Sequence, residues 1–453
     1  MKVRSLLLIV AAMLLGSQPG AAQDTATVAK PAVWSLQNCI EYAKQQNITI
    51  KRNKVSAQTA TVNVAQAKAA REPSLSFSTN QGFTNRPFQQ SSAMVNGSQV
   101  VTSNNKNSYS GNYGFNAQMT LYDGGQTSNN IKLQKINSQI ADLAVTTSEM
   151  TIEEQITKLY VQILYSMETI KQDEEQIKLS SASAERARAL FKEGVLNKAD
   201  VAQLEAQCAN DKYQLVADQS TLDNYKLQLK QLLELDGDEE LNIVVPNLDG
   251  DVMAVLPSKR DVYNAALNLR PEIKANKLSM DASDLSIKMA KAGKLPTLSL
   301  TAGMTTLNMS NNGNFFDQLK RQWNNTIGLS LNIPILDRRS TKSAVEKAKL
   351  EKQNSYLQLL DTQKNLWKSI EGYWQEATSA QASYKAAKEQ AEAVRTSYDL
   401  TSEQFRLGMK NIIELLTDQK NLSAANQKVI QTKYMEVLNA SLLKYYGGDS
   451  INL

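Results

Sequence analysis

The sequence contains Pro73-Ser74-Leu75-Ser76-Phe77 and repeats this motif, 223 positions later, as Pro296-Thr297-Leu298-Ser299-Leu300. Self-similarity at a long offset indicates that a structural unit has been duplicated. The offset shortens once, by nine positions, and then stays at 214, so the two copies differ by one longer loop. The later pairs are Leu121-Tyr122-Asp123 with Ile335-Leu336-Asp337, and Phe191-Lys192-Glu193-Gly194 with Phe405-Arg406-Leu407-Gly408.

The duplication divides the chain into parts. Before the first copy, Lys2 and Arg4 precede a short apolar run and a small-residue site, which is typical of a cleaved signal peptide. Between the copies lies a segment with acidic residues, Pro and Gly. We therefore expect a signal peptide at 1–22, a first structural repeat at 23–235, a linker at 236–257, a second repeat at 258–446 and a C-terminal tail at 447–453.

Each repeat contains two short, uncharged segments in which apolar and polar residues alternate with period two. Such alternation predicts strands with one apolar face. Each segment has about ten residues, the length that a tilted strand needs to cross a bilayer. A soluble four-stranded sheet is the alternative. The strands are expected at 75–83, 113–121, 298–306 and 325–335, with hairpin loops at 84–112 and 307–324.

The remaining sequence predicts long helices packed as coiled coils. Residues 124–190 and 338–404 run without proline, and a 67-residue helix is about 100 Å long. Their apolar residues follow a 3-4 spacing, which favours coiled-coil packing. Four helices of half that length are expected at 35–71, 197–235, 258–291 and 411–445, with a capping box of Ser258 and Asp261. Two of them placed end to end match one long helix.

The composition argues against an enzyme. The chain has no His, which excludes a Ser-His-Asp triad and an H-E-x-x-H zinc site, and it has no P-loop motif. With 50 basic and 45 acidic residues it lacks the positive surplus of a nucleic-acid-binding protein. No cofactor or metal is expected. The acidic run 173–175 is interpreted as a solvated helix face, and Cys39 and Cys208 are expected about 40 Å apart, beyond disulfide reach.

Four strands cannot form a closed sheet in a membrane alone, because both edges would expose unpaired backbone groups. Additional strands must come from other copies of the chain. Two, three or four copies would each close the barrel, and three give twelve strands. The expected fold is thus a membrane β-barrel continued by a barrel of long antiparallel helices.

With the segments 34–43 and 121–126 and both Phe-x-x-Gly turns, the whole mature chain resembles the TolC-like outer membrane efflux protein family. The resemblance implies a homotrimer in the outer membrane with its helical part in the periplasm. It also implies an exit duct that docks on a periplasmic adaptor and an inner-membrane pump of the RND, ABC or MFS type, for multidrug export or type I secretion. An envelope scaffold or adhesin is the alternative. The resemblance rests on residues 34–43, Asn47, 121–126, 270–273, 333–337 and both Phe-x-x-Gly turns.

The resemblance also suggests two sets of functional residues near the turns. The exposed tips that contact an adaptor would be Gly194, Val195, Gly408 and Met409. The constriction would carry Asp200 and Glu414, repeated in each copy and favouring cations, with Lys410 pairing with an acid to hold the closed state. Thr417 and Phe405 complete this set. At the position of Thr417 the family can carry a second carboxylate. Solvated surface charges are the alternative interpretation of the acids.

Overall fold

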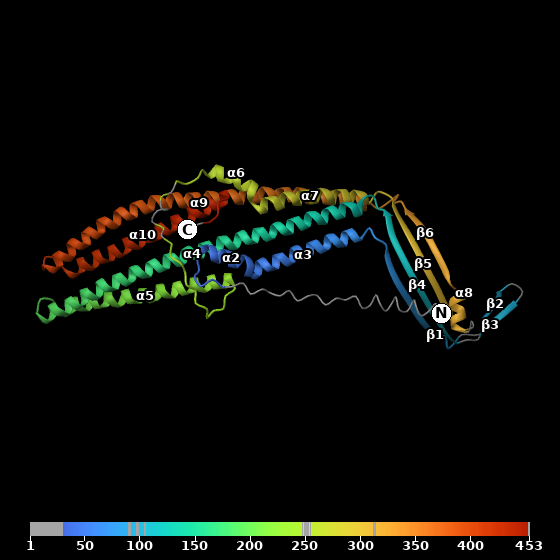
Figure 1. The fold of residues 1–453 in the computed structure, drawn as a ribbon, viewed down its shortest axis with the longest axis horizontal. Coiled ribbons are helices and arrows are strands. Elements are labelled where there is room, and N and C mark those ends of the chain that lie inside the picture. The colour runs from blue at the N-terminus through green and yellow to red at the C-terminus, as the bar shows by residue number, and fades with distance from the viewer. Residues whose placement is uncertain are drawn as a thin grey trace.

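The computed structural model describes residues 30–88, 92–96, 99–103, 106–246, 248, 253, 255–310 and 314–451. The expected signal peptide at 1–22 lies outside the described residues, as do parts of the expected linker and tail. The molecule is elongated, with a β-sheet at one end and two helical hairpins reaching to the other end (Figure 1). None of the helices in these ranges is both long and apolar enough to span a bilayer.

One antiparallel sheet has the strand order β1-β4-β5-β6. Its strands are β1 (Ser74–Asn85), β4 (Asn107–Tyr122), β5 (Thr297–Met309) and β6 (Asn324–Asn332), which confirms the four predicted strands. β6 ends before the predicted position because Pro334 has no backbone N–H to continue the ladder. The two predicted hairpin loops contain secondary structure of their own. The first contains the hairpin β2 (Ser92–Asn96) and β3 (Gln99–Ser103), and the second contains helix α8 (Phe315–Arg321).

The register of the sheet separates an apolar face from a polar face. Directly opposed residues on antiparallel strands share a face, and Phe77 pairs with Phe115, which pairs with Met304. The rings of Phe77 and Phe115 lie 4.9 Å apart. One residue further along, Ser76, Asn116 and Gly303 are aligned on the opposite face. The alternation that predicted the strands therefore yields a sheet with one apolar and one polar side.

Two helical hairpins of equal size form the far end. The long helices α4 (Gln126–Lys192) and α9 (Ser340–Arg406) have 67 residues each. Each turns back into a 36-residue helix, α5 (Lys198–Leu233) and α10 (Ile412–Gly447) respectively. The two hairpins start together near the middle of the molecule and diverge toward their tips (Figure 1).

The other two short helices are each broken, which corrects the prediction of continuous helices at 35–71 and 258–291. The structure has α2 (Leu36–Gln46) followed by α3 (Ile48–Ala69), and α6 (Lys259–Leu269) followed by α7 (Pro271–Ala292). Asn47 causes the first break, because its side-chain oxygen caps the N–H groups of Thr49 and Ile50. Pro271 causes the second, since a residue before proline avoids the helical conformation.

The predicted capping box at the start of α6 is also wrong. Ser258 is the N-cap residue, but its side chain makes no capping hydrogen bond. The backbone alone begins this helix, with the Asp261 N–H donating to the Ser258 carbonyl at 3.0 Å.

The main core lies at mid-length, where α2 and α6 meet the long helices. Its largest buried side chains include Tyr160, Ile370 and Leu442. The Tyr160 hydroxyl donates to the Val244 carbonyl at 2.6 Å, which fastens the segment between the repeats to α4. Cys39 and Cys208 are both buried and free, in agreement with the prediction that they do not pair.

Candidate functional site

Each hairpin turns at a glycine in the left-handed conformation. Gly194 has φ of 78° and Gly408 has φ of 76°, values that favour glycine. The next residue closes each turn, since the N–H of Val195 donates to the Leu190 carbonyl at 2.9 Å and that of Met409 donates to the Gln404 carbonyl at 2.9 Å. This is the Schellman motif of a helix C-terminus. Both Phe-x-x-Gly turns thus end a long helix as predicted.

An asparagine three residues after each glycine starts the returning helix. The side-chain oxygen of Asn197 accepts from the Asp200 N–H at 2.9 Å, and that of Asn411 accepts from the Glu414 N–H at 3.0 Å. The predicted helices start at 197 and 411, but the capping role of these two residues was not predicted. The shared spacing Gly-x-x-Asn in both repeats is the signal that identifies them, because Asn is a preferred N-cap residue.

The turns expose apolar side chains at the end of the molecule farthest from the sheet (Figure 1). Val195 and Met409 are each 66% exposed. Exposed apolar residues that cluster at one end of a protein favour contact with a partner. A Cβ placed at Gly194 or Gly408 would meet open space, so none of the described residues covers the turns at these two positions.

The predicted constriction residues lie close to the two turns. Asp200 and Glu414 are in the first turns of α5 and α10, and Thr417 is one turn further along α10. Phe405 is in the last turn of α9, and Lys410 is in the turn that precedes α10. Lys410 forms an ion pair with Glu414 in the first turn of α10, which raises the pKa of Lys410. The hydroxyl of Thr417 donates to the Ile413 carbonyl at 2.7 Å. Phe405 is partly buried against a second apolar cluster, which lies near the tips and includes Leu204 and Leu415. Within the described part of the chain, no ion pair joins Asp200 to this group.

Polar contacts hold the two helices of each hairpin together near the tip. Arg188 on α4 contacts Glu205 on α5 at 2.6 Å. On the other hairpin, Asp418 accepts hydrogen bonds from Thr401 at 2.7 Å and Ser397 at 3.2 Å. Asp418 therefore fastens α10 to α9. It was not among the predicted site residues.

Near the tips, a charge on one hairpin acts on an acidic residue of the other. The hydrogen bond from Arg406 lowers the pKa of Glu403 on α9, and the charge of Arg186 on α4 lowers it further. A buried apolar cluster also draws residues from both hairpins, including Leu204 on α5 and Leu415 on α10. The two turns are therefore separate, but the helices next to them are joined by an apolar cluster and by charged residues.

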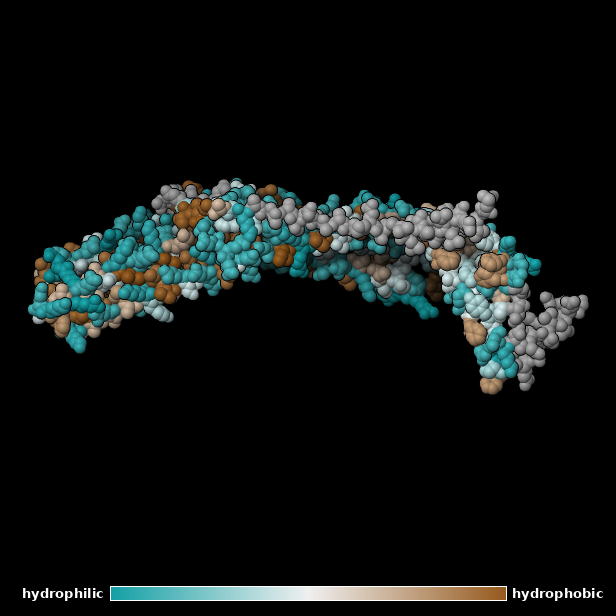
Figure 2. All heavy atoms as spheres, turned by 60° about the horizontal axis from the view of Figure 1, so that its bottom comes forward, coloured by the Kyte–Doolittle hydropathy of each residue, from teal (hydrophilic) through white to brown (hydrophobic). Residues whose placement is uncertain are grey.

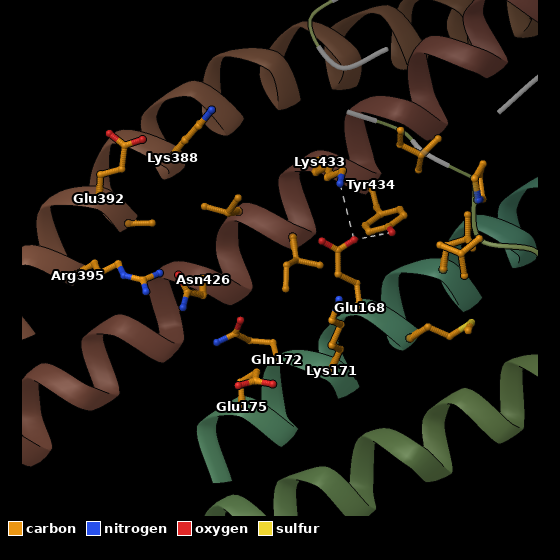
Figure 3. Close-up of a pocket in the computed structure, with 18 residues that line it drawn as sticks. Glu168, Lys171, Gln172, Glu175, Lys388, Glu392, Arg395, Asn426, Lys433 and Tyr434 are labelled. Carbon is orange, nitrogen blue, oxygen red and sulfur yellow. Dashed lines mark hydrogen bonds and ion pairs between the residues drawn. The ribbon is translucent and has the colours of Figure 1, made fainter. Parts of the chain in front are cut away.

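A cavity of about 800 Å³ opens between α4 and the α9–α10 hairpin. Figure 3 shows Glu168 reaching from α4 to Tyr434 and Lys433 on α10, at 2.6 Å and 3.8 Å. Beyond this contact the cavity carries charges of both signs. Its lining includes Lys171 and Glu175 on α4, and Glu392 and Arg395 on α9 (Figure 3). The Glu168 contacts thus join the two hairpins beside this open, charged cavity.

A second polar cavity of about 550 Å³ contains Asp173 and Asp211, with Lys420 of α10 on its wall. Asp173 is only 5% exposed, so the interpretation of 173–175 as a solvated face is wrong at this residue. Burial raises the pKa of Asp173 to about 7, and the neighbouring Asp218 and Asp211 act in the same direction. Within the described residues, no cluster of three or more Cys, Asp or Glu could hold a metal ion.

A charge-free sheet joined to two long helical hairpins defines a channel-type envelope protein. The family model of the outer membrane efflux protein matches residues 39–234 and 262–443, and the chain belongs to that family. This confirms the predicted class, an efflux channel of the outer membrane, and disfavours the scaffold alternative.

Named relatives and solved structures agree with this assignment. The chain is 22% identical over 404 residues to the outer membrane efflux protein BepC of Brucella suis, covering 88% of this chain and 82% of BepC. It is 22% identical over 326 residues to TolC of Escherichia coli, covering 69% of this chain and 64% of TolC. The fold matches CusC with a TM-score of 0.79 at 16% identity, covering 94% and 96% of the two chains. It matches the Campylobacter jejuni channel CmeC with a TM-score of 0.75 at 16% identity, covering 92% and 87%.

Proposed function

We propose that three copies of this chain form the exit duct of a tripartite efflux system. In this proposal residues 1–22 direct export, twelve strands form a barrel in the outer membrane, and the helices form a tunnel in the periplasm. The duct conducts small molecules passively, and an inner-membrane pump of the RND, ABC or MFS type supplies the energy. A periplasmic adaptor connects the two. No catalytic role is assigned to the chain.

The open sheet is the observation that carries the proposal. β1 and β6 are its edges: β1 pairs only with β4 and β6 only with β5 among the described residues, so the outer side of each strand has no partner. Ile327 on β6 is 82% exposed on the apolar face. An apolar sheet face with two open edges is stable in a bilayer only when further strands close it. Three copies of four strands provide an even number of strands within the range of membrane barrels.

The upper helices have open edges of the same kind. α3 packs on α4, α4 on α7 and α7 on α9, which leaves α3 and α9 at the outside of the row. α3 exposes Ile48, Val55 and Val62 at seven-residue spacing, and α9 exposes Leu350 and Leu357 at the same spacing. Figure 2 shows such hydrophobic side chains among hydrophilic ones along the helical body. Heptad stripes on both edges suit coiled-coil contacts between copies.

Trimer formation and conduction test the proposal together. Native mass spectrometry of the detergent-solubilised protein is expected to give a trimer, and planar-bilayer recordings are expected to show conductance. A monomer without conductance would contradict the proposal.

The tip assignment predicts adaptor contact. A Val195→Cys variant lacking Cys39 and Cys208 is expected to crosslink a periplasmic adaptor in the native cell. Ile327→Cys in the same background is the matched control, because it lies on the apolar sheet face at the opposite end of the molecule. Equal capture of the adaptor from both positions would contradict docking at the tip.

We also propose that the residues behind the tips form the constriction. Asp200 and Glu414, repeated threefold, would attract cations, and the Lys410–Glu414 pair would weaken one of the two rings. Asp200→Ala with Glu414→Ala is expected to reduce cation selectivity and change conductance. Asp223→Ala, an exposed acid in mid-α5, serves as control. Unchanged conductance and selectivity in the double variant would refute this assignment.

A further inference from the structure

Helix α8 lies on the apolar side of the sheet at its outer end. The hydroxyl of Thr306 on β5 donates to the Leu319 carbonyl of α8 at 2.8 Å. The ring of Tyr113 on β4 meets the ring of Phe315 edge to face at 6.4 Å between centroids. Tyr113 and Thr306 are directly paired, two residues along from the pair Phe115 and Met304. All four side chains therefore point to the same face, and α8 covers the end of that face.

The opposite face of the sheet has a different composition. Its residues are small and polar, as in the aligned set Ser76, Asn116 and Gly303. In a barrel whose apolar face meets lipid, this polar face lines the lumen. The contacts of α8 with Thr306 and Tyr113 thus place it outside the barrel wall, on the lipid-facing side, and not over the channel.

The outward surface of α8 carries aromatic residues, two basic residues at its C-terminal end and one acid, Asp317, in its first turn. Phe316 is 74% exposed, and Trp323, which directly precedes β6, is 55% exposed. Lys320 and Arg321 end the helix, are both exposed, and make no ion pair within the described residues. Aromatic side chains with basic neighbours are characteristic of segments that lie in the interface between lipid chains and headgroups.

The position of α8 along the sheet agrees with an interfacial depth. On β5 the apolar residues Leu300, Ala302 and Met304 precede Thr306, where α8 begins to cover the strand. On β6 the corresponding run from Leu331 to Ile327 ends at Asn325, whose side chain accepts a hydrogen bond from the indole N–H of Trp323 at 3.0 Å. On both strands, the hydrogen-bonding side chains thus begin at the level where the apolar residues of the lipid-facing side end.

We propose that α8 is an interfacial anchor that binds anionic lipid headgroups at the outer edge of the barrel. Phe316 and Trp323 insert among the outer ends of the lipid chains, while Lys320 and Arg321 bind headgroup phosphates. The inference rests on the proposed function, because it requires the apolar face of the sheet to meet lipid. It adds a defined lipid contact that the channel activity does not itself require.

Spin labelling of the full-length protein in vesicles tests the position of α8. The label is attached to Phe316→Cys in a chain lacking Cys39 and Cys208, in vesicles of phosphatidylcholine and phosphatidylglycerol. Its accessibility to oxygen, which concentrates in lipid, is compared with its accessibility to a neutral, water-soluble nickel chelate. We expect Phe316→Cys to favour oxygen. The comparison label is at Leu307→Cys, on the polar face of β5 beside Thr306, the residue that contacts α8. If the Phe316 label is as accessible to nickel as this label, the proposal is overturned.

A label at Leu329→Cys, midway along β6 on the apolar face, separates this proposal from the proposed function. If that label favours oxygen while the Phe316 label favours nickel, the barrel is correct and the α8 anchor is wrong. If the Leu329 label also favours nickel, the sheet does not face lipid and the proposed function itself fails.

The charge contribution is tested in the same vesicles. Adding phosphatidylglycerol to phosphatidylcholine is expected to lower the nickel accessibility of the Phe316 label, and Lys320→Gln with Arg321→Gln is expected to abolish this effect. The control is Lys212→Gln with Lys364→Gln, two exposed lysines on the helical body, which should leave the effect intact. An effect of equal size in both double variants would contradict headgroup binding by α8.

Discussion

Replacing Asp173 by asparagine is expected to stabilise the protein at neutral and alkaline pH. Asp173 lies on α4 facing Asp211 and Asp218 of α5, with Lys420 of α10 on the wall of the same cavity. Its Oδ2 atom is buried and accepts no hydrogen bond within the described residues. An ionised carboxylate there is costly, because burial and two neighbouring carboxylates all oppose its negative charge.

The pKa of Asp173 determines the size and the pH range of the effect. Its rise from 3.8 to about 7 is a difference of roughly three units, which corresponds to at most about 4 kcal/mol. The folded chain keeps this proton at pH values where the unfolded chain has released it. The free energy of unfolding therefore falls as the pH rises from about 4 to 7 and then levels off.

Asp173→Asn keeps the shape of the side chain and removes the charge, so it removes this loss of stability. We expect the variant to match the natural chain near pH 4 and to be more stable at pH 8. At roughly 2 °C or less per kcal/mol for a chain of this size, the gain in Tm is several degrees. Circular dichroism at a fixed scan rate in detergent measures it.

Glu175→Gln is the matched control, because Glu175 lies in the same acidic run but is exposed and pairs with Lys178. It should give no gain at pH 8. If Asp173→Asn gives no gain at pH 8, or the same gain at pH 4 and pH 8, then Asp173 does not carry a buried charge in the folded protein and the reasoning is wrong.

Four further substitutions test the turns and the core. Gly194→Ala and Gly408→Ala should each lower the free energy of unfolding by about 1 kcal/mol, because alanine is strained at positive φ. Chemical unfolding measures this loss. The control, Gly237→Ala, is in open space without positive φ and should be neutral. Asn411→Ala removes an N-cap and should cost about 1 kcal/mol, with faster amide exchange at the start of α10; unchanged exchange would exclude the cap. Arg270→Lys should lower Tm, since Arg270 is buried against Glu272 at 2.8 Å and the Tyr446 ring at 4.3 Å and lysine cannot form both contacts; an unchanged Tm would show that the charge alone matters.

The prediction of the turns succeeded because their chemistry is local. A glycine at positive φ and an asparagine three residues later end one helix and start the next through hydrogen bonds within a few residues of sequence. The helix breaks were missed although their signals were equally local. Asn47 and Pro271 stand in the sequence as an N-cap residue and a helix breaker, inside segments that were each predicted as one continuous helix.

The sequence by itself determined the strands, their uncharged character and the alternation that gives the sheet one apolar and one polar face, because side chains of a strand alternate whatever surrounds it. Only the tertiary structure decided that Asp173 is buried and that α8 covers the apolar face. Both depend on partners distant in sequence. Asp173 is buried by helices α5 and α10, and α8 is placed by β4 and β5. Burial and docking are properties of such long-range contacts, and no local pattern records them.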